Sequence, residues 1–216
     1  MPLRVHLHPL SSFCWKVLIG LYENDTPFEA VTVNFGDAVS RDAFQSLWPL
    51  AKIPLIEDSD RGEIVPETSI MFDYLDTHYP GPLRYNGGDP DQVWRTRMWD
   101  RVFDHHVHHH MQKIVGDRLR PAGRKDPYGV EEARARLTLA YGVVESEAAR
   151  RTWFSGERFG RADCSAFPAL YYANRVQPLG DQYPAVSAYL ARLADRPSVR
   201  RVLAEAKPFF KYFPEG

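Results

Sequence analysis

The chain has 216 residues with 27 basic and 28 acidic side chains, giving a formal net charge of −1. A balance this even provides no electrostatic footprint for nucleic acid or for an anionic membrane. No apolar run is long enough to span a bilayer, and the first residues lack the apolar core of a signal peptide. Two cysteines, Cys14 and Cys164, are too few for a disulfide framework or a structural zinc site. We therefore expect a cytoplasmic protein without membrane or nucleic-acid partners.

The first eighty residues mix short strands with helices. Residues 3–7 alternate apolar and polar positions, which predicts a strand, and apolar residues from Cys14 to Leu21 recur at helical spacing. Further strands are predicted at 28–33, 54–57 and 63–65, with an irregular helix before the second of these and a helix at 68–78. The order βαβαββα is that of a thioredoxin-like domain.

The composition changes at Tyr79. Residues 79–90 contain three prolines and three glycines, a combination that halts helices and suits a linker. The remaining sequence has apolar residues at helical spacing throughout. We therefore predict an α/β plus all-α protein, with a thioredoxin-like domain at 1–80, a linker at 81–92 and an all-helical domain at 93–216.

Four motifs in this order resemble those of the soluble glutathione transferases. The segment SSFCWKV is similar to the serine-type classes and most of all to the zeta class. LAKIPLIED resembles the family's segment with a cis-proline before the third strand, and PETSIMFDYLDTHYP resembles the helix that begins with a Glu-Ser pair. SGERFGRADCSAFP resembles the family's helix-capping segment, in which Asp163 is the capping acid.

The resemblance implies an enzyme that joins glutathione, as a co-substrate, to a small hydrophobic electrophile. It further implies that the first domain binds glutathione, that the helical domain lines the electrophile pocket, and that the protein is a homodimer. Two other functions stay open. One is a glutathione-dependent isomerase similar to maleylacetoacetate isomerase, and the other is a non-catalytic member that binds ligands or a protein.

The glutathione-binding residues implied by the resemblance are Lys52, Ile53, Pro54, Glu67 and Thr68. Glu67 can pair with the glutathione ammonium, while Thr68 and the free N–H groups of the following helix hold the adjacent carboxylate. A cis Ile53-Pro54 bond would offer the Ile53 backbone to the glutathione cysteine, and Lys52 can reach the glycine carboxylate. Considered alone, Glu67-Thr68 is equally typical of an ordinary helix cap.

Ser11 is the candidate catalytic residue, with Ser12 as the alternative. A hydroxyl just before a helix can donate to the glutathione thiolate, and the helix N-terminus adds partial positive charge. Cys14 shares a helical stripe with Leu18 and Leu21, so we expect it to be buried and unreactive. A thiol-based disulfide reductase or glutathionyl transferase would resemble this chain with Cys in place of Ser11.

Five of the eight histidines lie between Asp104 and Met111, on the first long helix of the second domain. Helical periodicity places His106 and His110 on one stripe with Trp99 and Phe103. No acidic or cysteine partner at defined spacing completes a metal site, so we expect no metal. In the family this helix lines the cleft. The residues expected in the electrophile pocket are His106, His110, Lys113 and Tyr171.

Overall fold

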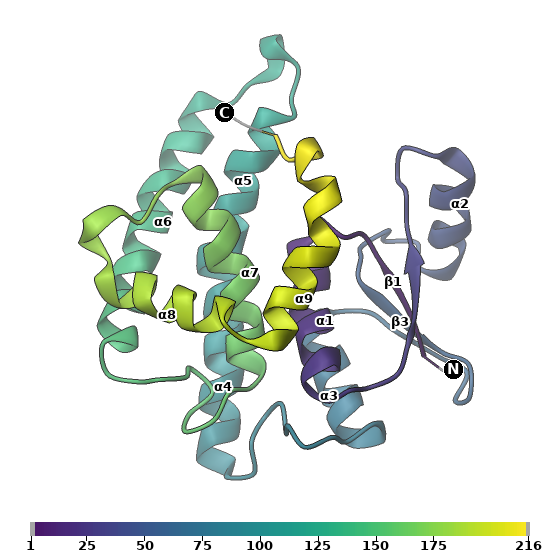
Figure 1. Ribbon diagram of the computed structural model, residues 1–216. Helices are drawn as coiled ribbons and strands as arrows, with labels where there is room; N and C mark the ends of the chain where they lie inside the picture. The colour runs from purple at the N-terminus through teal and green to yellow at the C-terminus, as the bar shows by residue number, and fades with distance from the viewer. Residues whose placement is uncertain (1–2, 215–216) are drawn as a thin grey trace.

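The computed structural model describes residues 3–214 (Figure 1). The first part of the chain alternates strands and helices in the predicted order. Its elements are β1 (Leu3–Leu7), α1 (Ser12–Glu23), β2 (Glu29–Thr32), α2 (Ala38–Leu47), β3 (Leu55–Asp58), β4 (Glu63–Val65) and α3 (Thr68–His78).

The four strands form one mixed sheet in the order β2-β1-β3-β4. β1 is parallel to β2 and antiparallel to β3, and β3 is antiparallel to β4. The helix α1 supplies the crossover connection that a parallel β1–β2 pair needs. In Figure 1, α2 lies beyond the sheet, whereas α1 lies between the sheet and the rest of the molecule. The predicted thioredoxin-like fold is confirmed.

The second part is helical throughout, as predicted, and residues 79–89 separate it from α3. Its first long helix is interrupted by a π-helical segment, η1, and continues afterwards. The elements are α4 (Pro90–Val102), η1 (Phe103–His108), α5 (His109–Arg118), η2 (Ala122–Arg124), α6 (Pro127–Ala148), α7 (Arg161–Val176), η3 (Gly180–Gln182), α8 (Pro184–Ala194), α9 (Pro197–Ala206) and η4 (Lys207–Tyr212).

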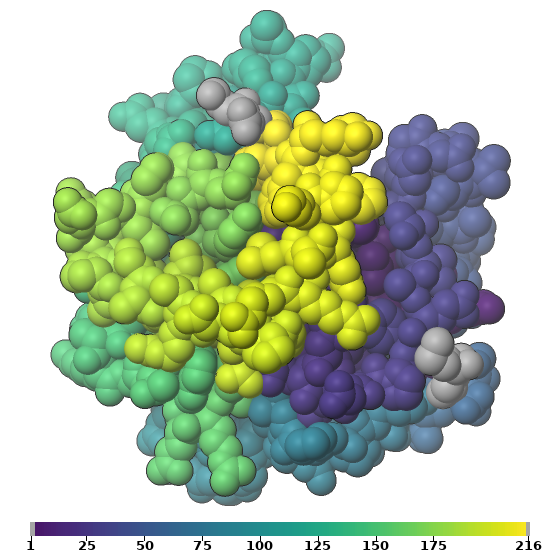
Figure 2. Space-filling view, in the orientation of Figure 1, coloured from purple at the N-terminus to yellow at the C-terminus, as the bar shows by residue number. Residues whose placement is uncertain are grey.

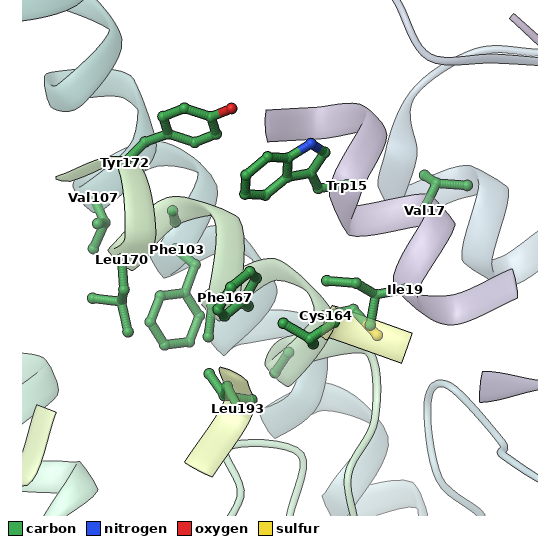
Figure 3. Close-up of a cluster of buried hydrophobic side chains, with 14 of the residues drawn as sticks. Trp15, Val17, Ile19, Phe103, Val107, Cys164, Phe167, Leu170, Tyr172 and Leu193 are labelled. Atoms are coloured by element: carbon green, nitrogen blue, oxygen red, sulfur yellow. The ribbon is translucent and has the colours of Figure 1, made fainter. Parts of the chain in front are cut away.

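The two parts share one hydrophobic core. Figure 3 shows Trp15 of α1 facing Phe167 and Tyr172 of α7, and the ring centroids of Trp15 and Tyr172 are 4.8 Å apart. The last helices cover α1 from outside, which Figure 2 shows as the yellow C-terminal segment lying against the purple N-terminal one. Because α1 is buried between the sheet and α7, its first turn is held firmly at the junction of the two parts.

A buried set of ion pairs also joins the two parts. Lys16 of α1 is 1% exposed, and its Nζ lies 2.6 Å from Asp100 Oδ1 and 2.8 Å from Asp104 Oδ2. Arg161 of α7 donates to Asp100 and to Asp73 of α3. Burial alone would raise the pKa of Asp100, but Lys16 and Arg161 outweigh it and hold that pKa well below its usual range.

Asp163 organises the start of α7, as its motif predicts. Its carboxylate is fully buried and accepts hydrogen bonds from the backbone N–H groups of Phe154, Ser155 and Gly160, and from the Tyr189 hydroxyl. The carboxylate therefore caps α7 and ties it to the preceding loop and to α8.

Within residues 3–214 no helix is both long and apolar enough to cross a bilayer, and this includes α6 with its 22 residues.

Candidate active site

Two adjoining cavities lie where the first turn of α1, the loop before β3 and the start of α3 meet the helical part. The small cavity has a volume of about 310 Å³ and the large cavity one of about 770 Å³. Lys52, Ile53 and Gln112 line both, so the two form one cleft. Of the sequence-predicted residues, the small cavity is lined by Lys52, Ile53, Pro54, Glu67 and Thr68, and the large cavity by Ser11, Ser12, Lys52 and Ile53.

The loop before β3 carries a cis peptide bond between Ile53 and Pro54, as expected from the motif. Pro54 is buried, whereas Ile53 is partly buried and faces both cavities. The exposed Lys52 lies beside them and brings a positive charge to the cleft.

Glu67 is the N-cap residue of α3, but it does not act as an ordinary cap. Its φ angle is 65°, a left-handed conformation that non-glycine residues rarely adopt, and its side chain makes no capping hydrogen bond. Such strained positions concentrate at functional sites. The Glu67 carboxylate is exposed at the small cavity, next to the buried Thr68 at the first helical position. The pair thus presents an anion beside the N-terminus of a helix.

Ser11 is the N-cap residue of α1. Its Oγ accepts a hydrogen bond from the Cys14 N–H at 3.4 Å, which leaves the hydroxyl proton free to donate. Ser12 begins the helix itself and is 7% exposed. Its Oγ lies 2.5 Å from Nε2 of His108. Both hydroxyls line the large cavity at a helix N-terminus, where a negative charge is favoured.

Cys14 is fully buried in the core, as predicted. Burial raises the pKa of its thiol to about 12, although hydrogen bonds with Ser11 and His8 act in the opposite direction. A thiol in this environment is neither a nucleophile nor a metal ligand at neutral pH. The three candidate side chains of SSFCWKV are thereby reduced to the two hydroxyls.

The helical wall of the cleft differs from the prediction. His106 is exposed and His110 partly buried, and neither lines either cavity. Lys113 instead pairs with Asp126 at the start of α6. Tyr171 lies in an aromatic cluster, with its ring centroid 5.2 Å from that of Trp15. The structure therefore places all four expected pocket residues away from the cleft.

The π-helical segment η1 explains this difference. After Phe103 the buried row continues with Val107 and Met111, at intervals of four, where an α-helical stripe would have continued with His106 and His110. In an α-helix, a residue four positions further along the chain points about 40° away from the first around the helix axis. The π-turn has more residues per turn, so it offsets this rotation and keeps every fourth residue near one face. The histidines that reach the small cavity are accordingly His105 and His109.

Several cleft residues were not predicted from the sequence. Arg101 and Asp104 lie at the small cavity, beside Glu67. Trp48 also lines this cavity, and its indole N–H is buried without a hydrogen-bond partner among residues 3–214. Its position directly before the cis-proline loop was the only available signal. The large cavity has an apolar side formed by Leu10, Phe35, Met111, Val115, Leu119, Tyr172, Tyr212 and Phe213.

Within residues 3–214, no three His, Cys, Asp or Glu side chains are grouped so as to hold a metal ion. The cleft is lined by hydroxyl donors, helix N-termini and paired charges beside an apolar cavity. This combination suits a ligand with both ammonium and carboxylate groups and an ionisable centre next to the serines.

Comparisons with known proteins agree with this geometry. Residues 6–83 match the N-terminal domain of glutathione S-transferases, and residues 106–197 match their C-terminal domain. The chain is 25% identical to glutathione S-transferase GstB of Escherichia coli K12 over 190 residues, which cover 87% of this chain and 91% of GstB. It is 26% identical to glutathione S-transferase APIC of Nicotiana tabacum, with 92% and 95% covered.

Solved structures show the same fold. A glutathione S-transferase from Methylobacillus flagellatus with glutathione bound has a TM-score of 0.83 at 24% identity, covering 93% of this chain and 98% of that one. Glutathione transferase URE2P8 from Phanerochaete chrysosporium, with oxidised glutathione, has a TM-score of 0.86 at 19% identity, with 97% of each chain covered. The chain belongs to the glutathione S-transferase family.

Proposed function

We propose that the protein is a serine-type glutathione transferase that conjugates glutathione thiolate to a small hydrophobic electrophile. The observation that carries this proposal is one continuous cleft that brings Ser11, Ile53 and Glu67 together, although they lie on three separate segments. Glutathione needs a partner for its ammonium end, its thiol and its glycine carboxylate, and this cleft offers one for each. The first motif indicates the zeta class of glutathione transferases, and this class assignment stays a prediction.

The small cavity is suited to the two charged ends of glutathione. Glu67 pairs with the ammonium group, while Thr68 and the N-terminal N–H groups of α3 bind the adjacent carboxylate. Lys52 can donate to the glycine carboxylate, and so can the indole N–H of Trp48, which has no partner within residues 3–214. The Ile53 backbone binds the central cysteine as an added strand would.

Ser11 stabilises the thiolate. Its hydroxyl has a free proton to donate, and a hydrogen bond to a charged group is worth roughly 1.5 to 3 kcal/mol. One pKa unit corresponds to about 1.36 kcal/mol, so a single donor lowers the thiol pKa by about one to two units. Starting from about 8.5, this makes thiolate abundant near neutral pH.

The electrophile occupies the large cavity. Its apolar side is formed mainly by aromatic rings and branched aliphatic side chains, which favour a hydrophobic molecule of moderate size. We propose the corresponding division of labour between residues 1–80, which bind glutathione, and residues 93–216, which line this cavity, with residues 81–92 as the linker.

We propose that the enzyme is a homodimer. Ile70 of α3 and Trp94 and Met98 of α4 are 53%, 51% and 42% exposed. An ion pair between Asp73 and Arg97 links the two helices, and we propose that these exposed apolar side chains contribute to the dimer interface. Light scattering after size-exclusion chromatography should give twice the chain mass, and a Met98→Asp variant should be shifted to the monomer.

Two measurements test the proposed function. Isothermal titration with glutathione should show binding, and 1-chloro-2,4-dinitrobenzene should be conjugated in its presence. Binding without turnover of a panel of electrophiles would favour the non-catalytic alternative. Turnover of a cis-dienone without conjugation would favour the isomerase. Absence of glutathione binding would refute the proposal.

A further inference from the structure

The Ser12 hydroxyl is held by a histidine from the helical part of the chain. Ser12 Oγ and His108 Nε2 are 2.5 Å apart, and the two residues are only 7% and 2% exposed. The Phe13 ring packs on the imidazole, with 4.0 Å between the ring centroids. Ser12 nevertheless lines the large cavity together with Ser11. A buried imidazole therefore supports one of the two hydroxyls at the proposed thiol position.

The fold holds this pair in register. Asp100, Asp104 and His108 follow one another at four-residue intervals along α4 and η1, and all three are buried. On α1, Ser12 and Lys16 are also four residues apart. Lys16 bonds to both aspartates while Ser12 bonds to His108, so two rows face each other along the helices. Without the π-turn, His108 would be rotated out of this row.

The imidazole is neutral at physiological pH. Burial lowers the pKa of His108 to about 3, and the electrostatic effects of Lys16 and the neighbouring His109 act in the same direction. Lys16 faces it from α1, and Asp104 and His109 lie on its own helix. A neutral imidazole has one ring nitrogen that donates and one that accepts. His108 is thus a hydrogen-bonding group, and it does not serve as the base that removes the thiol proton.

We propose that His108 is a positioning residue that presents the Ser12 hydroxyl to the glutathione sulfur, so that Ser11 and Ser12 both donate to the thiolate. This inference rests on the glutathione site proposed above. With its proton on Nε2, His108 donates to Ser12 Oγ, which leaves the Ser12 O–H free to donate to sulfur. With the proton on Nδ1, Ser12 donates to the imidazole and turns only lone pairs toward the cleft.

The bound thiolate selects the first arrangement, because only this arrangement gives the anion a second donor. The chain runs from imidazole N–H to serine O–H to sulfur, and each hydrogen bond polarises the next. Both tautomers are neutral, so the selection separates no charge in the buried site. The effect of His108 is therefore felt at the sulfur, although the two do not touch.

The test uses Ser12→Ala, His108→Leu, His108→Gln and the Ser12→Ala/His108→Leu double variant, with His78→Leu as a matched control at the exposed end of α3. The pKa of bound glutathione is read from the ultraviolet absorbance of thiolate against pH, and the dissociation constant from isothermal titration. Ser12→Ala and His108→Leu should each raise the thiol pKa by about one unit, which lowers the ratio of thiolate to thiol at a given pH about tenfold.

The double variant should be no worse than either single variant, because both remove the same donor. His108→Gln keeps an amide group near the Nε2 position and should stay near the wild type, as should His78→Leu. Dissociation constants should change less than threefold. If His108→Leu fails to fold in a thermal unfolding scan, a raised thiol pKa in Ser12→Ala together with a near wild-type pKa in His108→Gln still supports the inference. A wild-type thiol pKa in Ser12→Ala still overturns it.

Wild-type thiol pKa values in Ser12→Ala would overturn the inference while leaving the proposed function intact. Additive effects in the double variant would do the same, since they would mean that His108 acts independently of Ser12. If the wild-type protein bound no glutathione, the proposed function would fail and this inference with it.

Discussion

The two walls of the cleft hold their functional groups in different ways. On the thioredoxin-like wall, Ile53, Glu67 and Ser11 are placed by backbone features of short segments, namely a cis-proline loop, a residue with positive φ and a helix N-cap. On the helical wall, Met111 and Val115 are placed by the phase of a long helix. A local backbone feature can be predicted from a few residues of sequence. The face of a long helix on which a side chain lies depends instead on the number of residues in every turn before it.

The buried junction between the walls gives the largest expected effect. Lys16→Met should lower the free energy of unfolding by about 3 to 5 kcal/mol, because it leaves Asp100 and Asp104 buried with less compensation. Chemical denaturation monitored by circular dichroism measures this loss. A loss below about 1 kcal/mol would mean that the two walls are joined by apolar packing alone.

The same variant should change the pH dependence of stability. The depressed pKa of Asp100 stabilises the wild type above the unfolded value of about 3.9, and this stabilisation is lost as pH falls through the lower folded value. Lys16→Met removes the main cause of the depression. The stability difference between the two proteins should therefore narrow as pH is lowered from 5 to 2 in denaturation curves.

On the thioredoxin-like wall, Glu67→Ala should weaken glutathione binding by about 10- to 100-fold, the equivalent of one charge-assisted hydrogen bond. Isothermal titration measures the change. Asp60→Ala, on the exposed turn between β3 and β4, is the matched control. Equal affinity in Glu67→Ala and the wild type would show that the strained conformation at this residue serves folding only.

Ser11→Ala should lower kcat/KM by about tenfold to a hundredfold while changing glutathione affinity little, because the hydroxyl acts on the thiolate and not on the bound peptide. Steady-state kinetics with varied electrophile at saturating glutathione measure kcat/KM, and isothermal titration measures the glutathione affinity. Unchanged kcat/KM in Ser11→Ala, together with a large loss in Ser12→Ala, would identify Ser12 as the principal donor.

On the helical wall, Val115→Ala should raise KM for an apolar electrophile by about threefold to tenfold, in proportion to the buried methyl groups removed. His106→Ala, on the face that an unbroken α-helix would have turned to the cleft, should have no effect. The reverse outcome would mean that the π-turn does not set the working face of this helix.

The smallest effect on activity is expected from Cys14→Ala. The thiol is fully buried and its pKa is raised to about 12, so turnover should be unchanged while stability falls by about 1 kcal/mol. Loss of turnover in this variant, with Ser11→Ala still active, would mean that the thiol carries the chemistry.

Sequence reasoning succeeded where the signal was local. The strand at residues 63–65 and the helix at 68–78 have the predicted bounds, and the cis-proline is present at Pro54. It did not find Trp48 or Arg101 in the cleft, because neither stands in a motif that marks a site. Their contribution depends on how the loop before β3 packs against α4.

The amino-acid sequence by itself determined the order of the elements, the two-part organisation and the segments that meet at the cleft, since apolar periodicity, turn residues and caps act over a few residues. Only the tertiary structure decided which face of the histidine-rich helix lines the cleft. The reason is physical: the row from Asp100 to His108 must match Ser12 and Lys16 on α1, and a π-turn supplies that match.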